Sequence, residues 1–209
     1  MTLEEVQRAG RAVETAKRVA GAASDTGVQM LDAPVSGGPE GVASATLSFM
    51  VGGPETAFHK ACPILDVMGK RVLHFGPAGS GQAAKACHNM ICGITSLAVR
   101  ESFALAERLG LDARQFYELC AGAAAQSWIL ENRCPVPGVA DNTPASNSYR
   151  PGFAAGLMAK DLRLAQQAAS ACGQTTPFGA AATERFSAFA VGDDAGLDFS
   201  AVYRTLDNQ

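Results

Sequence analysis

The sequence predicts a partial α/β sheet followed by an all-helical domain built around one long helix. In residues 1–78, strand-like and helix-like segments alternate with short connections, which is typical of α/β proteins. From residue 79 onward the apolar residues recur only at helical intervals. A glycine-rich turn at Gly79 leads into a helical pattern that no proline interrupts before Gly110. We therefore expect one domain over residues 1–78 and a helical domain over residues 79–209.

The first domain is expected to contain two helices and three strands. A capping-box pattern at Thr2 predicts a helix that begins almost at residue 1. Apolar and β-branched residues, bounded by turn residues, predict the strands, and Pro54 suits the first turn of the second helix. We expect strands over 28–33 (VQMLDA), 46–52 (TLSFMVG) and 71–75 (RVLHF), with a helix over 54–67. Because a complete doubly wound domain needs two βαβαβ halves, these elements predict the trailing part of a larger α/β domain.

Capping residues and helical periodicity predict the elements that follow the long helix. Asp112 is suited to cap a helix, and the segment that begins at Phe153 is clearly amphipathic. Four prolines among small polar residues predict a loop between these helices. We expect helices over 112–124, 153–172, 177–191 and 200–206, a further turn over 126–132, and an ordered loop or a linker over 134–152.

Composition excludes several classes of partner. The chain is 47% hydrophobic and 18% charged, which is typical of a globular protein. A net charge of −3, without any stretch of basic residues interleaved with aromatics, argues against nucleic acid. No apolar run reaches the length of a membrane span, so we expect no membrane partner. The six cysteines include no CxxC pair, so we expect reduced thiols and no metal site.

The turn that precedes the long helix matches two nucleotide-binding patterns only in part. Residues 79–84 (GSGQAA) have the glycine spacing of a dinucleotide fingerprint, but no second strand with an acidic residue follows about 20 positions later. Gly76 and Gly81 have the spacing of phosphate-loop glycines, but Gln82 and Ala83 stand where that loop needs Lys and Ser or Thr. The sequence therefore predicts neither kind of site here.

Lys85 is the strongest catalytic candidate on chemical grounds. It lies in the opening turns of the long helix, where the positive end of the helix dipole favours loss of its proton. Asn89 is four residues later, so the two side chains share one helix face. A neutral lysine acts as a general base, and a nearby amide can hold a substrate oxygen. From spacing alone, two solvated surface residues are the commoner interpretation.

Two other segments are suited to binding charged groups. Ser36, Gly37 and Gly38 directly follow a predicted strand, where glycines allow backbone N–H groups to approach an anion such as a carboxylate. An ordinary turn explains the same residues. Lys160 and Asp161 fit either a surface ion pair or a contact to a charged ligand.

Taken together, the motifs resemble the β-hydroxyacid dehydrogenases. The segments that carry the resemblance are 32–38 (DAPVSGG), 46–53 (TLSFMVGG), 79–89 (GSGQAAKACHN) and 156–161 (GLMAKD), in that order. It implies a partial Rossmann-type sheet, NAD as cofactor, a small 3-hydroxyacid as substrate and a homo-oligomer formed through the helical domain. A segment around Trp128 and the loop 135–139 (PVPGV) favour 3-hydroxyisobutyrate as the substrate, in valine catabolism. Reduction of tartronate semialdehyde is the alternative within the family.

The resemblance also implies a role for each candidate residue. Lys85 aligns with the catalytic lysine, and Asn89 with the amide that positions the substrate. The substrate carboxylate is expected to bind Ser36, Gly37 and Gly38. Lys160 aligns with a lysine that contacts the cofactor.

This chain departs from the family pattern in two places. His88 stands where relatives have an asparagine beside Asn89. The N-terminal dinucleotide-binding half, with its glycine fingerprint, is absent, so residues 1–78 are expected to be the C-terminal part of that domain. Loss of the pyrophosphate contacts should impair hydride transfer by this chain alone. A non-catalytic binding or oligomerisation module is therefore the alternative function. We expect a cytoplasmic protein in a bacterium, or a mitochondrial matrix protein in a eukaryote, with the targeting segment absent here.

Overall fold

The computed structural model describes residues 12–206, which form two compact units. The first unit comprises residues up to 88 together with 163–175, and the second comprises residues 89–162 together with the chain from 176 onward. Two long helices, α5 and α8, contribute to both units. The domain boundary between residues 78 and 79 stays a prediction. The helix start predicted at Thr2 lies outside the described residues.

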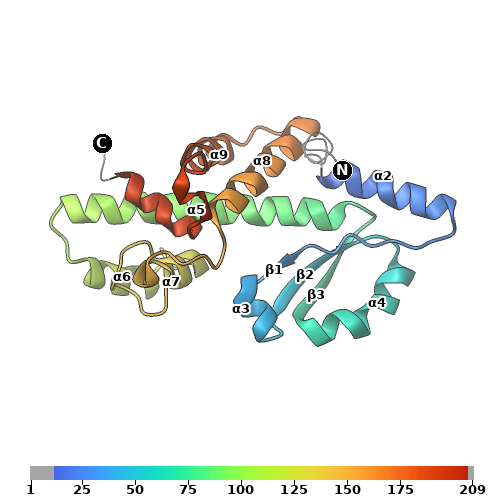
Figure 1. Ribbon diagram of the computed structural model, residues 1–209, viewed down its shortest axis with the longest axis horizontal. Helices are drawn as coiled ribbons and strands as arrows, with labels where there is room; N and C mark the ends of the chain where they lie inside the picture. The colour runs from blue at the N-terminus through green and yellow to red at the C-terminus, as the bar shows by residue number, and fades with distance from the viewer. Residues whose placement is uncertain (1–11, 207–209) are drawn as a thin grey trace. The chain divides into compact units, whose positions relative to one another are not determined.

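The first unit contains a small mixed sheet and the helices around it (Figure 1). Its elements are α2 (Ala12–Asp25), β1 (Val35–Ser36), α3 (Gly38–Ala43), β2 (Leu47–Gly52), α4 (Glu55–Met68), β3 (Gly69–Gly76) and the start of α5 (Ser80–Arg108). The strand order is β1-β2-β3, with β1 antiparallel and β3 parallel to β2. The parallel pair is connected through α4, as a βαβ unit requires. The partial α/β sheet predicted from the sequence is thus confirmed.

The central strand β2 carries most of the core of this unit. Five of its six residues are buried, as expected for a strand paired on both edges. Leu47, Phe49 and Val51 form a hydrophobic cluster that packs against partly buried side chains such as Phe58 and Val72. The strand predicted over residues 46–52 is thus confirmed, and its burial explains why apolar residues predominate in it.

The strand predicted over residues 28–33 is wrong. Only Asp32 pairs there, in an isolated antiparallel bridge with Gly52, and the strand itself begins at Val35. The partner strand ends at Gly52 because Gly53, with φ of 137°, and Pro54 turn the chain into α4. Within residues 12–206, no strand therefore lies opposite residues 28–31. Their apolar character predicted a strand, but strand formation also needs a partner.

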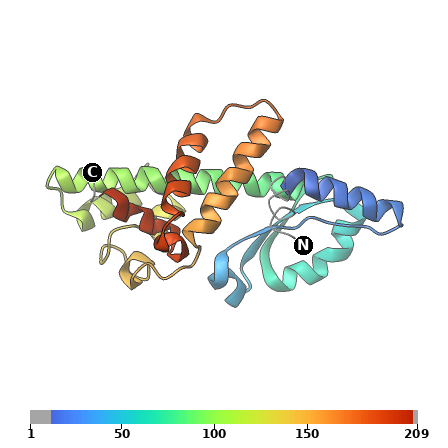
Figure 2. The ribbon, with the colours of Figure 1, turned by 45° about the horizontal axis from the view of Figure 1, so that its top comes forward.

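The long helix predicted from Gly79 is confirmed as α5, which runs unbroken for 29 residues (Figure 2, green). Gly110 ends it with a φ of 75°, a conformation that glycine adopts readily. The N–H of Leu111 reaches back to the Ala106 carbonyl oxygen at 3.0 Å, which completes a Schellman cap.

The second unit is helical, as predicted. Besides the larger part of α5 it contains α6 (Ala113–Ala121), α7 (Trp128–Arg133), η1 (Ala145–Asn147), the start of α8 (Ala155–Ala171), α9 (Pro177–Phe189), η2 (Asp193–Gly196) and η3 (Phe199–Leu206). The predicted cap of α6 is confirmed, because the Asp112 carboxylate accepts a hydrogen bond from the Gln115 N–H at 2.8 Å. None of the helices described in residues 12–206 has the length and apolarity to cross a membrane.

Two hydrophobic clusters form the core of the second unit. One gathers side chains of α8, α9 and η3, including Met158, Phe186 and Phe199. The other includes Phe103 of α5 and Leu130 of α7. The connection between α7 and α8 is the predicted proline-rich loop.

Candidate active site

The N-terminus of α5 is capped by Asp32, which lies far away in the sequence. The buried Asp32 carboxylate accepts hydrogen bonds from the N–H groups of Gly79, at 2.7 Å, and Gln82, at 2.9 Å. Helix N-termini leave N–H groups without intrahelical partners, and a carboxylate there also interacts favourably with the helix dipole. This contact holds the helix that carries Lys85 against the segment that leads into β1.

The glycines of the turn before α5 allow close packing against the sheet. A side chain at Gly81 would run into the backbone carbonyl oxygens of Met50 and Asp32. A Cβ at Gly52 would lie 2.6 Å from the Asp32 carboxylate. The glycines of residues 79–84 are therefore explained by close packing of this turn against the sheet.

Lys85 lies in the second turn of α5 and contacts the end of β1. Its Nζ donates a hydrogen bond to the Val35 carbonyl oxygen at 2.6 Å, and the side chain is half-buried. Val35 immediately precedes Ser36, the first residue of the predicted carboxylate-binding turn. The structure thus brings the predicted base to the residue beside the predicted substrate-binding turn.

Ser36, Gly37 and Gly38, which we call the carboxylate cradle, form the exit from β1. Gly37 and Gly38 have φ values of 139° and 62°, which side-chain-bearing residues rarely adopt, and both are exposed. The half-buried Ser36 lies with its Oγ 3.4 Å from Nε2 of His88. The sequence identified His88 only as a departure from the family pattern beside Asn89, without a role.

In the second unit, Asp161 links the two remaining predicted site residues. The buried Asn89 donates a short hydrogen bond of 2.5 Å from Nδ2 to the Asp161 carboxylate. Lys160 lies with its Nζ 2.9 Å from the other Asp161 oxygen, and its side chain is 54% exposed. The structure therefore joins Asn89 to Asp161 by a hydrogen bond and Lys160 to Asp161 by an ion pair. The roles assigned to the site residues in binding substrate or cofactor stay predictions.

Two functional contacts were missed by sequence reasoning. Asp32 lies within a motif that was recognised, but nothing local indicates that it accepts a hydrogen bond from Gly79, 47 residues later, just before α5. Asp161 was noted only as a neighbour of Lys160, while its contact to Asn89 spans 72 residues. The one signal for Asp161 in the sequence was that it is acidic, whereas most residues around it are apolar or small.

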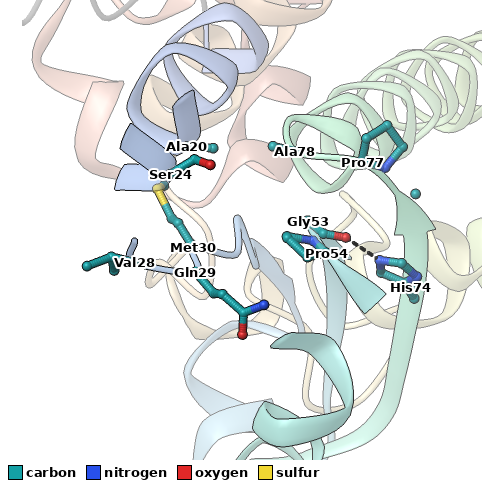
Figure 3. A pocket seen from close by; sticks show the side chains of 11 residues that line it. Ala20, Ser24, Val28, Gln29, Met30, Gly53, Pro54, His74, Pro77 and Ala78 are labelled. Carbon is teal, nitrogen blue, oxygen red and sulfur yellow. Dashed lines mark hydrogen bonds between the residues drawn. The ribbon is translucent and has the colours of Figure 1, made fainter. Parts of the chain in front are cut away.

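A cavity of about 570 Å³ lies elsewhere in the first unit, beside the ends of β2 and β3 (Figure 3). Its walls come from α2, from the segment around Met30, and from the turns after β2 and β3. His74 lies in its wall, with Nε2 2.8 Å from the Gly53 carbonyl oxygen (Figure 3). None of the lining residues is one of the predicted site residues, so we assign the cavity no part in catalysis.

The residues described here fit only part of an NAD site. Helix N-termini often bind pyrophosphate, but the Asp32 carboxylate already occupies the N–H groups of Gly79 and Gln82. An anionic phosphate would also be repelled by that carboxylate. Lys160, with its exposed ammonium group, fits a peripheral contact to a bound cofactor.

Comparison with known proteins places the chain in a family. Residues 6–76 match the model for the NAD-binding domain of 6-phosphogluconate dehydrogenase. Residues 79–206 match the model described as the NAD-binding domain of NADP-dependent 3-hydroxyisobutyrate dehydrogenase. A probable 3-hydroxyisobutyrate dehydrogenase of Mycobacterium tuberculosis is 46% identical over 93% of this chain. An NAD-dependent L-serine dehydrogenase of Pseudomonas aeruginosa is 42% identical over 92% of this chain.

Solved structures give the same result. The Mycobacterium tuberculosis 3-hydroxyisobutyrate dehydrogenase with L-serine superposes with a TM-score of 0.89 at 46% identity, covering 93% of this chain and 66% of that one. A 3-hydroxyisobutyrate dehydrogenase from Salmonella typhimurium gives 0.80 at 30% identity, covering 92% of this chain and 66% of that one. The chain spans 66% of the mycobacterial relative and 65% of the Pseudomonas relative. Because one family model alone covers more than half of the chain, the protein belongs to the 3-hydroxyisobutyrate dehydrogenase family.

Proposed function

We propose that this protein takes part in the NAD-dependent oxidation of 3-hydroxyisobutyrate to methylmalonate semialdehyde. The hydrogen bond from Lys85 to the Val35 carbonyl carries the proposal, because it places the base directly beside the carboxylate cradle. A 3-hydroxyacid has a carboxylate and a hydroxyl separated by two carbons. The cradle would hold the first group while Lys85 acts on the second.

The chemistry of the residues follows from these contacts. The Ser36 hydroxyl and the backbone N–H groups of Gly37 and Gly38 donate hydrogen bonds to the substrate carboxylate. Neutral Lys85 takes the proton from the substrate hydroxyl as a general base and returns it in the reverse direction. Bound NAD supplies the acceptor for the hydride that leaves the hydroxyl-bearing carbon.

Asn89 is proposed to hold the substrate hydroxyl. One hydrogen of Nδ2 is donated to Asp161, which orients the amide, and the other is proposed to donate to the substrate hydroxyl oxygen while Lys85 takes the hydroxyl hydrogen. Lys160 shares Asp161 and is proposed to contact the cofactor. Asp161 thereby contacts both Asn89, which is proposed to hold the substrate, and Lys160, which is proposed to contact the cofactor.

L-serine is a second candidate substrate. A relative that is 42% identical carries the name NAD-dependent L-serine dehydrogenase, and the similar mycobacterial structure contains L-serine. L-serine is also a 3-hydroxyacid, with an ammonium group in place of the methyl group. The same cradle and base would therefore act on it.

We also propose the wider organisation of the protein. Residues 1–78 are assigned to the end of a dinucleotide-binding domain and 79–209 to a helical domain that forms homo-oligomers, a division supported by the two family-model matches. Activity of this chain alone is proposed to be impaired, because residues 1–209 contain no complete dinucleotide fingerprint to hold the pyrophosphate. The non-catalytic module remains the alternative, and named relatives include both bacterial and mitochondrial proteins.

A comparison of substrates tests the proposed reaction. NADH formation by the purified chain is measured with 3-hydroxyisobutyrate and with L-serine, and NADH consumption is measured with tartronate semialdehyde. The proposal expects the highest kcat/KM for 3-hydroxyisobutyrate. A higher value for L-serine would support the second candidate instead. Binding of 3-hydroxyisobutyrate without any turnover would support the non-catalytic module and contradict the proposed reaction.

A further inference from the structure

Two side chains of α5, three residues apart, contact consecutive residues at the end of β1. Lys85 donates to the Val35 carbonyl oxygen at 2.6 Å, and His88 Nε2 lies 3.4 Å from Ser36 Oγ. Residues three apart on a helix are neighbours on its surface. The helix that carries the proposed base thus also presents an imidazole to the only hydroxyl of the carboxylate cradle.

We infer that His88 is a positioning residue for the substrate carboxylate, because its Nε2–H orients the Ser36 hydroxyl so that Ser36 donates its own hydrogen to the substrate. This inference rests on the proposed function, since it requires the cradle to bind a carboxylate. It assigns a task to a residue that is neither the base nor a direct ligand of the substrate.

The hydrogen-bonding capacity of Ser36 decides which state of His88 supports carboxylate binding. A serine hydroxyl has one hydrogen to donate and two lone pairs to accept with, and an ionised carboxylate only accepts. If His88 Nε2 were bare, it would take the Ser36 hydrogen, and the hydroxyl would turn its lone pairs toward the anion. If Nε2 carries hydrogen, Ser36 accepts from His88 and donates to the carboxylate. Binding of a carboxylate therefore selects the state of His88 with hydrogen on Nε2.

Both the neutral ring with hydrogen on Nε2 and the positively charged ring satisfy this requirement. Lys85, three residues before His88 on α5, also contacts the end of β1. In either state of the His88 ring, the donor toward Ser36 is the same. The role of His88 is thus to keep Ser36 a donor.

The test measures carboxylate binding to the complete 209-residue chain, without NAD, so that no turnover occurs. The probes are 3-hydroxyisobutyrate and its uncharged amide, 3-hydroxyisobutyramide, titrated by NMR. The chain has only three histidines, so ¹⁵N-labelled imidazole signals can be assigned through single substitutions. We expect 3-hydroxyisobutyrate, and not the amide, to shift the His88 Nε2 signal toward that of a protonated nitrogen.

Two substitutions separate the donor role from folding. His88→Leu removes the donor and should weaken 3-hydroxyisobutyrate binding by roughly three- to tenfold, the scale of one hydrogen bond, while amide binding stays unchanged. His88→Asn retains an N–H donor and should stay within about twofold of the unmodified chain. His59→Leu is the matched control, because His59 is an exposed histidine on α4 whose Nε2 lies 3.6 Å from the Glu55 carboxylate, and it should change nothing.

The outcomes separate this inference from the proposed function. If Ser36→Ala weakens carboxylate binding while His88→Leu leaves it unchanged, the cradle stands and the inference about His88 is wrong. Equal weakening by His88→Asn and His88→Leu would also overturn the donor role. If Ser36→Ala has no effect, or if the unmodified chain binds acid and amide alike, the proposed cradle fails and the inference fails with it.

Discussion

The Nζ of Lys85 donates a 2.6 Å hydrogen bond to the carbonyl oxygen of Val35, the residue that precedes Ser36. The helix that carries Lys85 is capped by Asp32, three residues before Val35 in the same segment. One short segment, residues 32–38, therefore fixes the start of the helix, contacts the proposed base and forms the carboxylate cradle. The proposed reaction depends on this arrangement of residues 32–38 and Lys85, and substitutions test each contact.

Replacing Asp32 should weaken the fold at the start of α5. Asp32→Ala leaves the Gly79 and Gln82 N–H groups without their acceptor, so we expect a loss of about 2 kcal/mol in the free energy of unfolding. Urea unfolding measures it, and amide hydrogen exchange should accelerate at these two positions. Asp25→Ala, at the exposed end of α2, is the control. Equal stability of the two variants would contradict the capping role.

Replacing a glycine by alanine should cost more stability where less space surrounds the glycine. Gly81→Ala would push a methyl group into the Met50 and Asp32 carbonyl oxygens, and we expect a loss of at least about 2 kcal/mol. Gly21→Ala in α2 has open space, and alanine is the better helix former, so a gain of about 0.5 kcal/mol is expected. Thermal unfolding of the two variants gives the comparison. A well-tolerated Gly81→Ala would show that the turn is not tightly packed.

In the helical unit, Asp198 should be the most sensitive acidic residue. Its fully buried carboxylate accepts from the N–H groups of Gly152, Phe153 and Ser200, and lies 3.6 Å from Arg133 Nε. Asp198→Ala removes the buried acceptor of these N–H groups and the carboxylate beside Arg133, so we expect a loss of roughly 3–5 kcal/mol. Asp194→Ala breaks only the exposed pair with Arg204 and should cost less than about 1 kcal/mol. Chemical denaturation measures both losses in the free energy of unfolding. Similar losses for Asp198→Ala and Asp194→Ala would contradict the greater importance of Asp198.

Cys134 should be the least reactive cysteine and should make stability depend on alkaline pH. Burial raises the pKa of its thiol, whereas Cys87 and Cys172 are exposed. Because the folded-state pKa lies above the unfolded value of about 8.5, this contribution to stability is complete below that pH and is lost as pH rises further. Mass spectrometry after iodoacetamide treatment should find Cys134 modified last. Cys134→Ala should flatten the fall in stability above about pH 8.5, and an unchanged slope would contradict the assignment.

Local patterns sufficed to predict much of the fold. The periodicity of α5, the apolar run of β2 and the Asp112 cap of α6 all depend on residues close together in sequence. The strand predicted over residues 28–33 was wrong because a strand depends on its partner, and β2 ends at Gly52.

The candidate site was predictable only where a motif contained it. Lys85, Ser36 and Asn89 came from recognised segments, but their contacts did not. The pairing of Asn89 with Asp161 spans 72 residues, and the cap of α5 by Asp32 spans 47. Such contacts follow from tertiary packing, which no local spacing encodes.

The most direct test of the central claim is NADH formation from 3-hydroxyisobutyrate by the complete chain and by Lys85→Met, with NAD binding followed by calorimetry in the same buffer. The account predicts weak NAD binding, slow turnover, and a further loss of at least about 100-fold in turnover in Lys85→Met with the affinity for NAD unchanged. Lys70→Met, at an exposed lysine of β3, should retain the turnover of the unmodified chain. Turnover by Lys85→Met equal to that of the unmodified chain would contradict the assignment of Lys85 as the base.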